Sequence, residues 1–137
     1  MALEADEPAV VVECLNGYRK KEPVPSNIGA FRVALGVTET LREGGDVTLL
    51  SYGSTLHLAL EASEPLAGLD IEVEVIDAQT LLPFDLEGAV AESVKKTNRL
   101  LVVDEDVSGG ASAYLLCLLY TSPSPRDATL SRMPSSA

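Results

Sequence analysis

Apolar and polar positions follow two different periods along the chain, one typical of strands and one typical of helices. Within residues 71–85, apolar residues alternate with Glu72 and Glu74, and then Val75 and Ile76 run together. Strict alternation indicates a half-exposed strand, and a continuous apolar pair indicates burial on both faces. The stretch therefore predicts a strand at the centre of the fold.

The same stretch predicts a change from strand to helix. Pro83 cannot donate a ladder hydrogen bond, and Asp85 is a favourable helix cap. Apolar residues recur at helical spacing from Leu86 to Val94, and Asn98 suits the left-handed position that closes a helix. We expect a strand followed by a crossover helix.

A similar unit precedes this one. Residues 47–50 read as a buried parallel strand, followed by a helix with Ser54 or Thr55 as its cap. Pro65 lies in the apolar helical pattern and removes a helix hydrogen bond, so we expect a kink or an early end near Ser63.

A third unit follows. Residues 100–103 are apolar without alternation, which predicts a strand covered on both faces, and a helix is expected from 108–112 until the pattern stops near Cys117. The extended pattern of residues 31–41 fits an antiparallel edge strand. Since crossovers between parallel strands are right-handed, the sequence predicts an α/β fold. It would be a three-layer α/β/α sandwich with a mostly parallel sheet and an antiparallel edge strand.

Both ends of the chain differ from this core. Residues 9–12 read as a short buried strand that must pair elsewhere, followed by a charged, proline-containing linker. We interpret 1–26 as the end of a truncated preceding domain plus linker, and 27–117 as the α/β domain. Residues 118–137 are rich in serine and proline, which indicates either a disordered tail or translated cloning or sequencing-adaptor sequence.

Composition limits the partners and the kinds of site that we expect for this chain. A net charge of −11, from 21 acidic and 10 basic residues, disfavours nucleic acid and anionic lipid as partners. No apolar run approaches the roughly 20 residues of a membrane helix, and no signal peptide is evident, so we expect no membrane association and a cytoplasmic location. Cys14 and Cys117 suggest neither a disulfide framework nor a zinc site, and we expect both to be buried thiols.

The sequence contains three candidate sites, and none of them matches a catalytic motif. Ser108, Gly109 and Gly110 could expose backbone N–H groups to a phosphate, but the acidic residues 104–106 precede them and the full Gly-x-Gly-x-x-Gly spacing is absent. Close helix packing or a subunit contact is the better interpretation of the glycines.

The other two candidates have equally plain interpretations. Ser54 and His57 do not match a hydrolase nucleophile motif, and capping and a polar helix position explain them. Glu72 and Glu74 could form a carboxylate pair, but solvated strand residues are the better interpretation. We assign no catalytic, cofactor-binding or metal-binding residue to this chain.

Several segments in fixed order resemble the transketolase-like C-terminal domain of the beta subunit of 2-oxo acid dehydrogenase first components. The segments are 11–19 (VVECLNGYR), 24–29 (VPSNIG), 41–54 (LREGGDVTLLSYGS), 75–85 (VIDAQTLLPFD) and 93–99 (SVKKTNR). Their ordered succession is specific, whereas a single segment would be weak.

The resemblance implies a part of an enzyme that decarboxylates a 2-oxo acid on thiamine diphosphate with magnesium and passes the acyl group to a lipoyl arm. It identifies residues 1–26 as the end of a pyrimidine-binding domain. It further implies that this part serves assembly with an alpha-type subunit or domain and a second beta-type subunit, and docks a lipoyl-bearing acyltransferase. No cofactor is expected on this part alone, which should be inactive, and branched-chain acids are favoured over pyruvate.

Two alternatives stay open at this point. The chain resembles, more weakly, the equivalent domain of a transketolase or a deoxyxylulose phosphate synthase. It could also be a free-standing, non-enzymatic interaction module whose acidic surface recruits a partner.

Overall fold

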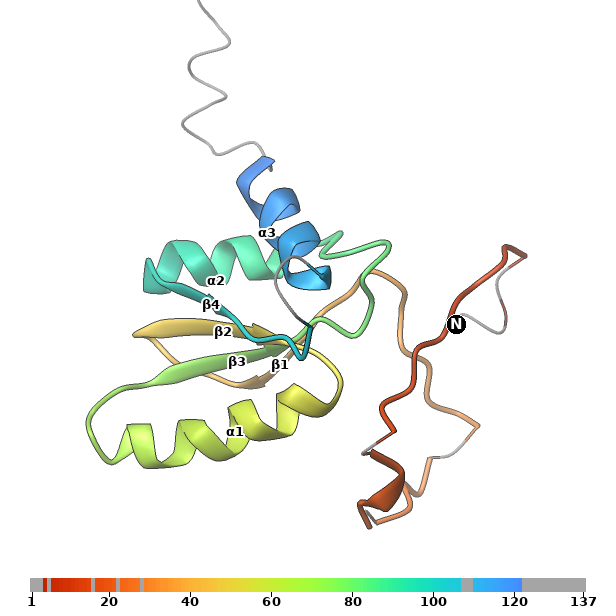
Figure 1. Ribbon diagram of the computed structural model, residues 1–137, viewed down its shortest axis with the longest axis horizontal. Helices are drawn as coiled ribbons and strands as arrows, with labels where there is room; N and C mark the ends of the chain where they lie inside the picture. Colours follow the sequence, from red (N-terminus) through yellow and green to blue (C-terminus); the bar gives the residue numbers. More distant parts are fainter. Residues whose placement is uncertain are drawn as a thin grey trace, which may run out of the picture.

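A mixed four-stranded sheet forms the centre of the molecule (Figure 1). The computed structural model describes residues 4, 6–15, 17–21, 23–27, 29–106 and 110–121. The strands are β1 (Glu39–Arg42), β2 (Val47–Ser51), β3 (Val73–Asp77) and β4 (Leu100–Val102), in the spatial order β1-β3-β2-β4. β2 pairs in parallel with both β3 and β4, and β1 pairs antiparallel with β3. The predicted parallel sheet with an antiparallel edge strand is confirmed.

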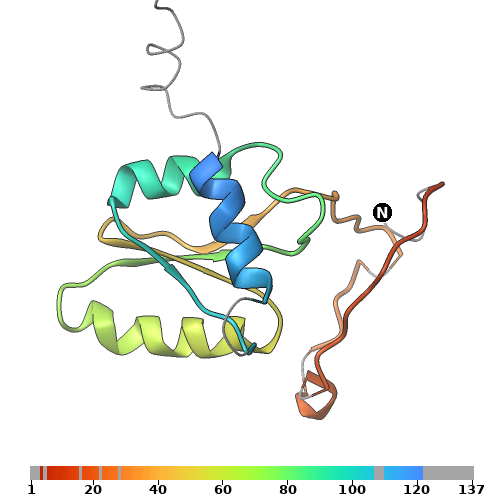
Figure 2. The same ribbon diagram turned by 45° about the horizontal axis from the view of Figure 1, so that its top comes forward.

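Helices cover both faces of this sheet, as Figures 1 and 2 show. α1 (Ser54–Ala67) lies on one face, and α2 (Ala89–Thr97) and α3 (Ala111–Thr121) lie on the other. Each of β2, β3 and β4 is followed by one of these helices, which confirms the three predicted strand–helix units and the α/β/α layers.

The core consists of one apolar cluster on each side of the sheet. Alternation along β3 directs Val75 to the α1 side and Ile76 to the side of α2 and α3, and these residues are 0% and 1% exposed. Leu115 of α3 is fully buried in the second cluster, with Val90 of α2. The prediction of a central, buried strand is therefore confirmed.

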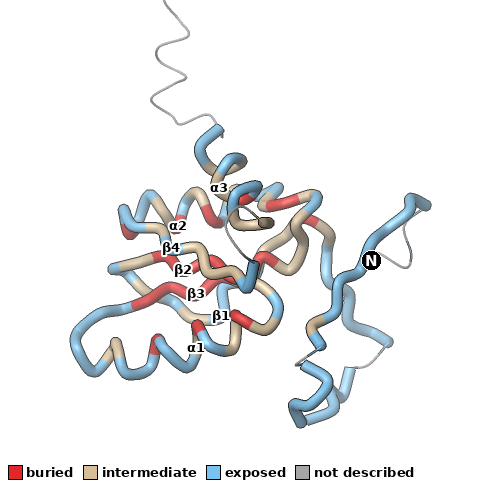
Figure 3. The backbone as a smooth tube through the Cα atoms, viewed as in Figure 1, coloured by how far each residue is buried: buried red, intermediate tan, exposed pale blue. Residues whose placement is uncertain are grey.

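Three expectations about strands differ from the structure. Leu101 in β4 is 50% exposed, because β4 pairs only with β2 among the described residues and its outer side has no cover. Residues 9–12, expected to pair with a strand elsewhere, form no strand with the described residues, and Val10 and Val12 are 92% and 86% exposed. They belong to an extended arm that lies apart from the sheet and carries the short 3-10 helix η2 (Gly17–Arg19) (Figure 3). Phe31 and Val33 also lie outside the edge strand, which is confined to β1.

Two helix boundaries differ from the predicted ones, and one agrees. α1 passes through Pro65 and ends at Ala67, so the hydrogen bond that the proline cannot donate does not end the helix near Ser63. Leu86 lies in a loop, and Asp85 instead accepts a hydrogen bond from the N–H of Val90, inside α2, at 3.1 Å. Asn98 closes α2 at φ 56°, as predicted.

α3 continues to Thr121, so the expected end of the helical pattern near Cys117 is also wrong. Leu118 and Leu119 pack against the core, which explains the extension. The expectation of two buried thiols is wrong as well, since Cys14 is half-buried and Cys117 is exposed. The predicted tail lies outside the described residues from 122 onward.

Candidate functional site

The sheet has a topological switch point between β2 and β4. These neighbouring strands lead to helices on opposite faces, since α1 follows β2 and α3 follows β4. In open α/β sheets, ligands bind beyond the carboxyl ends of the strands at such a point. In this chain Tyr52 follows β2 there, and Asp104 lies shortly after β4.

These two side chains are hydrogen-bonded to each other. The Asp104 carboxylate accepts hydrogen bonds from the Tyr52 hydroxyl and from the N–H groups of Ser112, at 3.0 Å, and Asp106, at 3.1 Å. Burial and the bond to Asp104 raise the pKa of Tyr52. Burial alone would raise the pKa of Asp104, but the hydrogen bonds from Tyr52 and Ser112 outweigh it and lower that pKa. The pair fastens the start of α3 to the end of β2.

The structure describes only Gly110 of the glycine-rich segment 108–110, since Ser108 and Gly109 lie outside the described residues. A Cβ added to Gly110 would lie 2.0 Å from a carboxylate oxygen of Asp106, so an acidic side chain packs directly against this glycine. A carboxylate in this position repels an anion.

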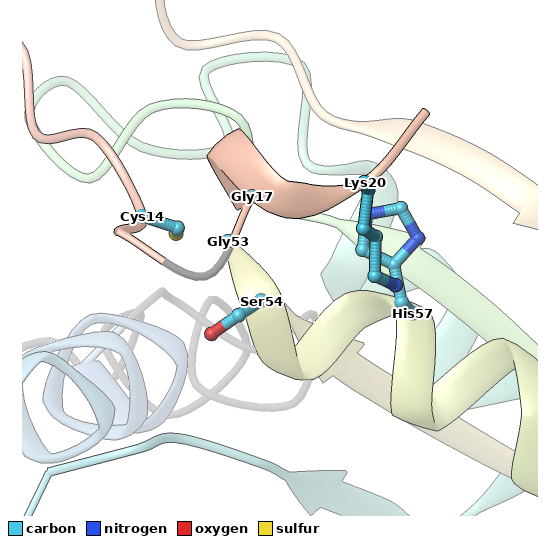
Figure 4. A pocket seen from close by; sticks show the side chains of 6 residues that line it. All are labelled: Cys14, Gly17, Lys20, Gly53, Ser54 and His57. Atoms are coloured by element: carbon cyan, nitrogen blue, oxygen red, sulfur yellow. The ribbon is translucent and has the colours of Figure 1, made fainter. Parts of the chain in front are cut away.

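A pocket of about 230 Å³ lies between the arm and the start of α1 (Figure 4). Its lining residues are Cys14, Gly17, Lys20, Gly53, Ser54 and His57. A Cβ at Gly53 would lie 2.7 Å from the sulfur of Cys14, so the glycine allows the arm to approach. Lys20, from the arm, and His57, from α1, both line this pocket (Figure 4).

Ser54 neither caps α1 nor acts as an activated nucleophile. Gly53, at φ 61°, occupies the cap position without a side-chain hydrogen bond, so the predicted Ser54 or Thr55 cap is wrong. The Ser54 hydroxyl is buried and has no hydrogen-bond partner. A nucleophilic serine needs a base within hydrogen-bond reach, so Ser54 and His57 share a pocket without forming a hydrolase pair.

Glu72 and Glu74 do not form a carboxylate pair. Glu72 precedes β3 and lies 3.6 Å from Arg42 in an exposed ion pair, whereas Glu74 is only 4% exposed. The prediction that both are solvated is wrong for Glu74, which pairs with Lys96 of α2. Among the described residues, no group of three or more His, Cys, Asp or Glu side chains could hold a metal ion.

Comparison with known proteins decides the family. The family described as "Transketolase, C-terminal domain" matches residues 36–130. The chain belongs to this transketolase C-terminal domain family. A solved structure titled "Split gene transketolase, inactive beta4 tetramer" is 34% identical, has a TM-score of 0.58, and is matched over 73% of this chain and 34% of its own length.

Curated relatives of this transketolase C-terminal domain are beta subunits. "Acetoin:2,6-dichlorophenolindophenol oxidoreductase subunit beta" of Cupriavidus necator is 40% identical, over 76% of this chain and 30% of the relative. "Pyruvate dehydrogenase E1 component subunit beta" of Staphylococcus epidermidis is 37% identical, over 76% and 31%. "2-oxoisovalerate dehydrogenase subunit beta" of Bacillus subtilis is 34% identical, over 80% and 33%. The chain spans about a third of the length of these relatives.

The sequence interpretation missed the tyrosine–carboxylate pair and the burial of Glu74. The available signal for Tyr52 was its position directly after a buried strand, where site residues of α/β proteins gather. Nothing local distinguished Glu74 from Glu72.

None of the helices in the described part of the chain is long and apolar enough to cross a membrane.

Proposed function

We propose that this domain is the C-terminal part of a beta subunit in the first component of a thiamine diphosphate-dependent 2-oxo acid dehydrogenase. The observation that carries the proposal is the family match over 36–130, together with beta-subunit relatives of two such dehydrogenases. The complete enzyme would decarboxylate a 2-oxo acid oxidatively and transfer the acyl group to a lipoyl group. Branched-chain acids such as 3-methyl-2-oxobutanoate are our favoured substrates over pyruvate.

The chemistry would belong to the rest of the enzyme. Thiamine diphosphate with magnesium supplies an electron sink for decarboxylation when bound. The described residues do not fit this group, because carboxylates lie beside the glycine turn at the switch point and no three-ligand metal cluster is present among them. We therefore assign no residue of this chain to the cofactor and expect the chain alone to be inactive.

The role of this domain would be assembly in the cytoplasm. Its partners would be an alpha-type subunit or domain, a second beta-type subunit and a lipoyl-bearing acyltransferase. The exposed arm supports this role, since apolar residues such as Val10 and Val12 are suited to pairing with a strand of a preceding pyrimidine-binding domain. In this proposal, 1–26 is the end of that domain with its linker.

Three measurements test the proposal. The DNA flanking this segment should encode a longer subunit, and the complete gene product with its alpha-type partner should oxidise 2-oxo acids in the presence of thiamine diphosphate. This chain alone should show no micromolar binding of thiamine diphosphate and magnesium in calorimetry. Tight binding would refute the assignment of the cofactor site to other parts of the enzyme.

A transketolase is the second candidate, favoured by the name of the solved relative. Activity of the complete gene product on sugar phosphates rather than on 2-oxo acids would select it.

A further inference from the structure

Among the described residues that line the pocket between the arm and α1, none is acidic, although the chain has 21 acidic and 10 basic residues. Two of the six lining residues, Lys20 and His57, can carry a positive charge, and they come from different elements (Figure 4). Asp77 of β3, whose charge interacts with His57, is not among the lining residues. The charge of the pocket therefore favours an anion, opposite to what the net charge of −11 indicates for the chain as a whole.

The start of α1 adds hydrogen-bond donors to the same pocket. Gly53 occupies the cap position and brings no side chain to bond the first N–H groups of this 14-residue helix. Such N–H groups and the helix dipole favour negative charge. Ser54 also lines the pocket, and its hydroxyl is buried without a hydrogen-bond partner among the described residues. Buried hydroxyls are nearly always hydrogen-bonded, so an unpartnered one beside a cavity is consistent with a bound ligand.

The pocket has room for a small polyatomic anion. Gly17 on the arm and Gly53 at the start of α1 leave the backbone accessible, since neither carries a side chain into the cavity. The cavity volume is about 230 Å³. A water molecule takes about 30 Å³ of liquid volume, so the pocket can hold a phosphate group with a few further atoms.

A single phosphate group fits these donors better than a carboxylate or a metal-bound diphosphate does. Its tetrahedral oxygens accept from ammonium, imidazole and backbone N–H groups that approach from different directions, whereas a carboxylate is planar. Magnesium in proteins is bound through carboxylates together with substrate phosphates, and the described lining contains no carboxylate.

From this arrangement we propose that the pocket binds one phosphate group, as inorganic phosphate or as a phosphomonoester, through Lys20, His57 and the first turn of α1. The proposal goes beyond the proposed function and does not depend on it, because neither thiamine diphosphate nor a partner subunit takes part in the binding.

Phosphorus NMR of inorganic phosphate with the 137-residue chain tests this proposal at constant ionic strength. The wild-type chain should shift and broaden the phosphate signal in a saturable way at millimolar concentrations. Lys20→Met and His57→Gln should each weaken binding about fivefold or more, because each removes a donor to the phosphate. Lys21→Met is the matched control, since it removes the same charge from the neighbouring arm residue, outside the lining, and should change binding by less than about twofold.

Methyl phosphate distinguishes the two sources of the phosphate group. It should compete with inorganic phosphate for the same site. Tighter binding of methyl phosphate would assign the pocket to a phosphomonoester, and weaker binding would assign it to inorganic phosphate.

A second measurement uses the wild-type chain and so does not depend on how a variant folds. In proton–nitrogen NMR spectra, phosphate should move the amide signals of residues 53–57 more than those of 111–115, which begin α3 without a neighbouring lysine and histidine pair in the described lining. No saturable binding, equal weakening by Lys20→Met and Lys21→Met, or amide shifts centred outside the pocket would each overturn the proposal. Neither measurement uses thiamine diphosphate, so failure of the proposed function would be recognised separately.

Discussion

The hydroxyl groups of Thr48 in β2 and Ser93 in α2 lie 2.6 Å apart inside the domain, where they join the sheet to the helix above it. Thr48 also contacts the Thr97 hydroxyl at 2.8 Å, and all three residues are at most 5% exposed. Buried hydroxyl groups stabilise a domain when each has a hydrogen-bond partner, and Thr48 is the member that links the other two.

Thr48→Val should therefore destabilise the domain. Valine keeps the shape but removes the hydrogen bonds to Ser93 and Thr97, each of which contributes about 0.5–1.5 kcal/mol. Urea unfolding followed by circular dichroism measures this loss. Thr40→Val, on the exposed part of β1, is the matched control and should stay within about 0.5 kcal/mol. Equal effects would contradict a structural role for the hydroxyl chain.

The buried Glu74 carboxylate predicts a pH dependence of stability. Burial alone would raise its pKa, but hydrogen bonds from Lys96, Ser93 and the N–H of Gly44 outweigh it and hold the pKa below its ordinary value of 4.5. A lowered pKa in the folded state gives stability that is present above 4.5 and is lost as pH falls through the folded value.

Lys96→Met should move that loss to higher pH, because burial would then act with less opposition. The measurement is the unfolding midpoint in urea between about pH 3 and pH 7, the range in which carboxylates titrate. Lys95→Met serves as control, since Lys95 pairs with exposed Glu92 at 2.5 Å on the surface. An identical pH profile for both variants would argue against the Glu74–Lys96 pair.

The turn between β1 and β2 provides a test of close backbone packing. A Cβ at Gly44 would lie 2.3 Å from the backbone carbon of Val73, whereas a Cβ at Gly45 would meet nothing within 4 Å. Gly44→Ala should cost about 1–3 kcal/mol through overpacking, and Gly45→Ala should change stability by less than about 0.5 kcal/mol. Thermal unfolding of the two variants side by side measures the difference, and a milder effect of Gly44→Ala would show that the turn can shift.

Asp85 should matter for α2 although it lies outside the helix. Asp85→Ala removes the acceptor for the N–H of Val90 and should cost about 0.5–2 kcal/mol, as loss of a helix cap does. Glu87→Ala, exposed in the same loop, is the control. Chemical unfolding of both variants distinguishes a cap from a general effect of removing a negative charge.

The strands, the helices and their order could be predicted from the sequence. The surroundings of individual side chains could not. Burial of Val75 and Ile76 followed from their adjacency in an apolar strand, since few other structures accommodate that pattern. Glu74 was predicted to be solvated because alternation shows only which face of the strand a side chain lies on. Its carboxylate can be buried because it pairs with Lys96, which lies on a helix distant in sequence.

Local signals also failed where tertiary packing decides the outcome. Ser54 has the composition of a cap, but Gly53 with its positive φ takes that position and permits the arm to approach. The apolar residues 100–103 suggested cover on both faces, which depends on neighbours that a local pattern does not reveal. The switch point, by contrast, follows from strand order, and strand order is a property of the whole sheet.

The two edge strands of the sheet, β1 and β4, differ in how well each could pair with an additional strand. β1 runs against β3 and shifts register between Thr40 and Arg42, an irregularity that discourages further pairing at that margin. β4 has a regular parallel register with β2, and half-exposed Leu101 lies within it. We therefore expect any strand added to this sheet, from the same polypeptide or from another, to pair with β4 rather than with β1.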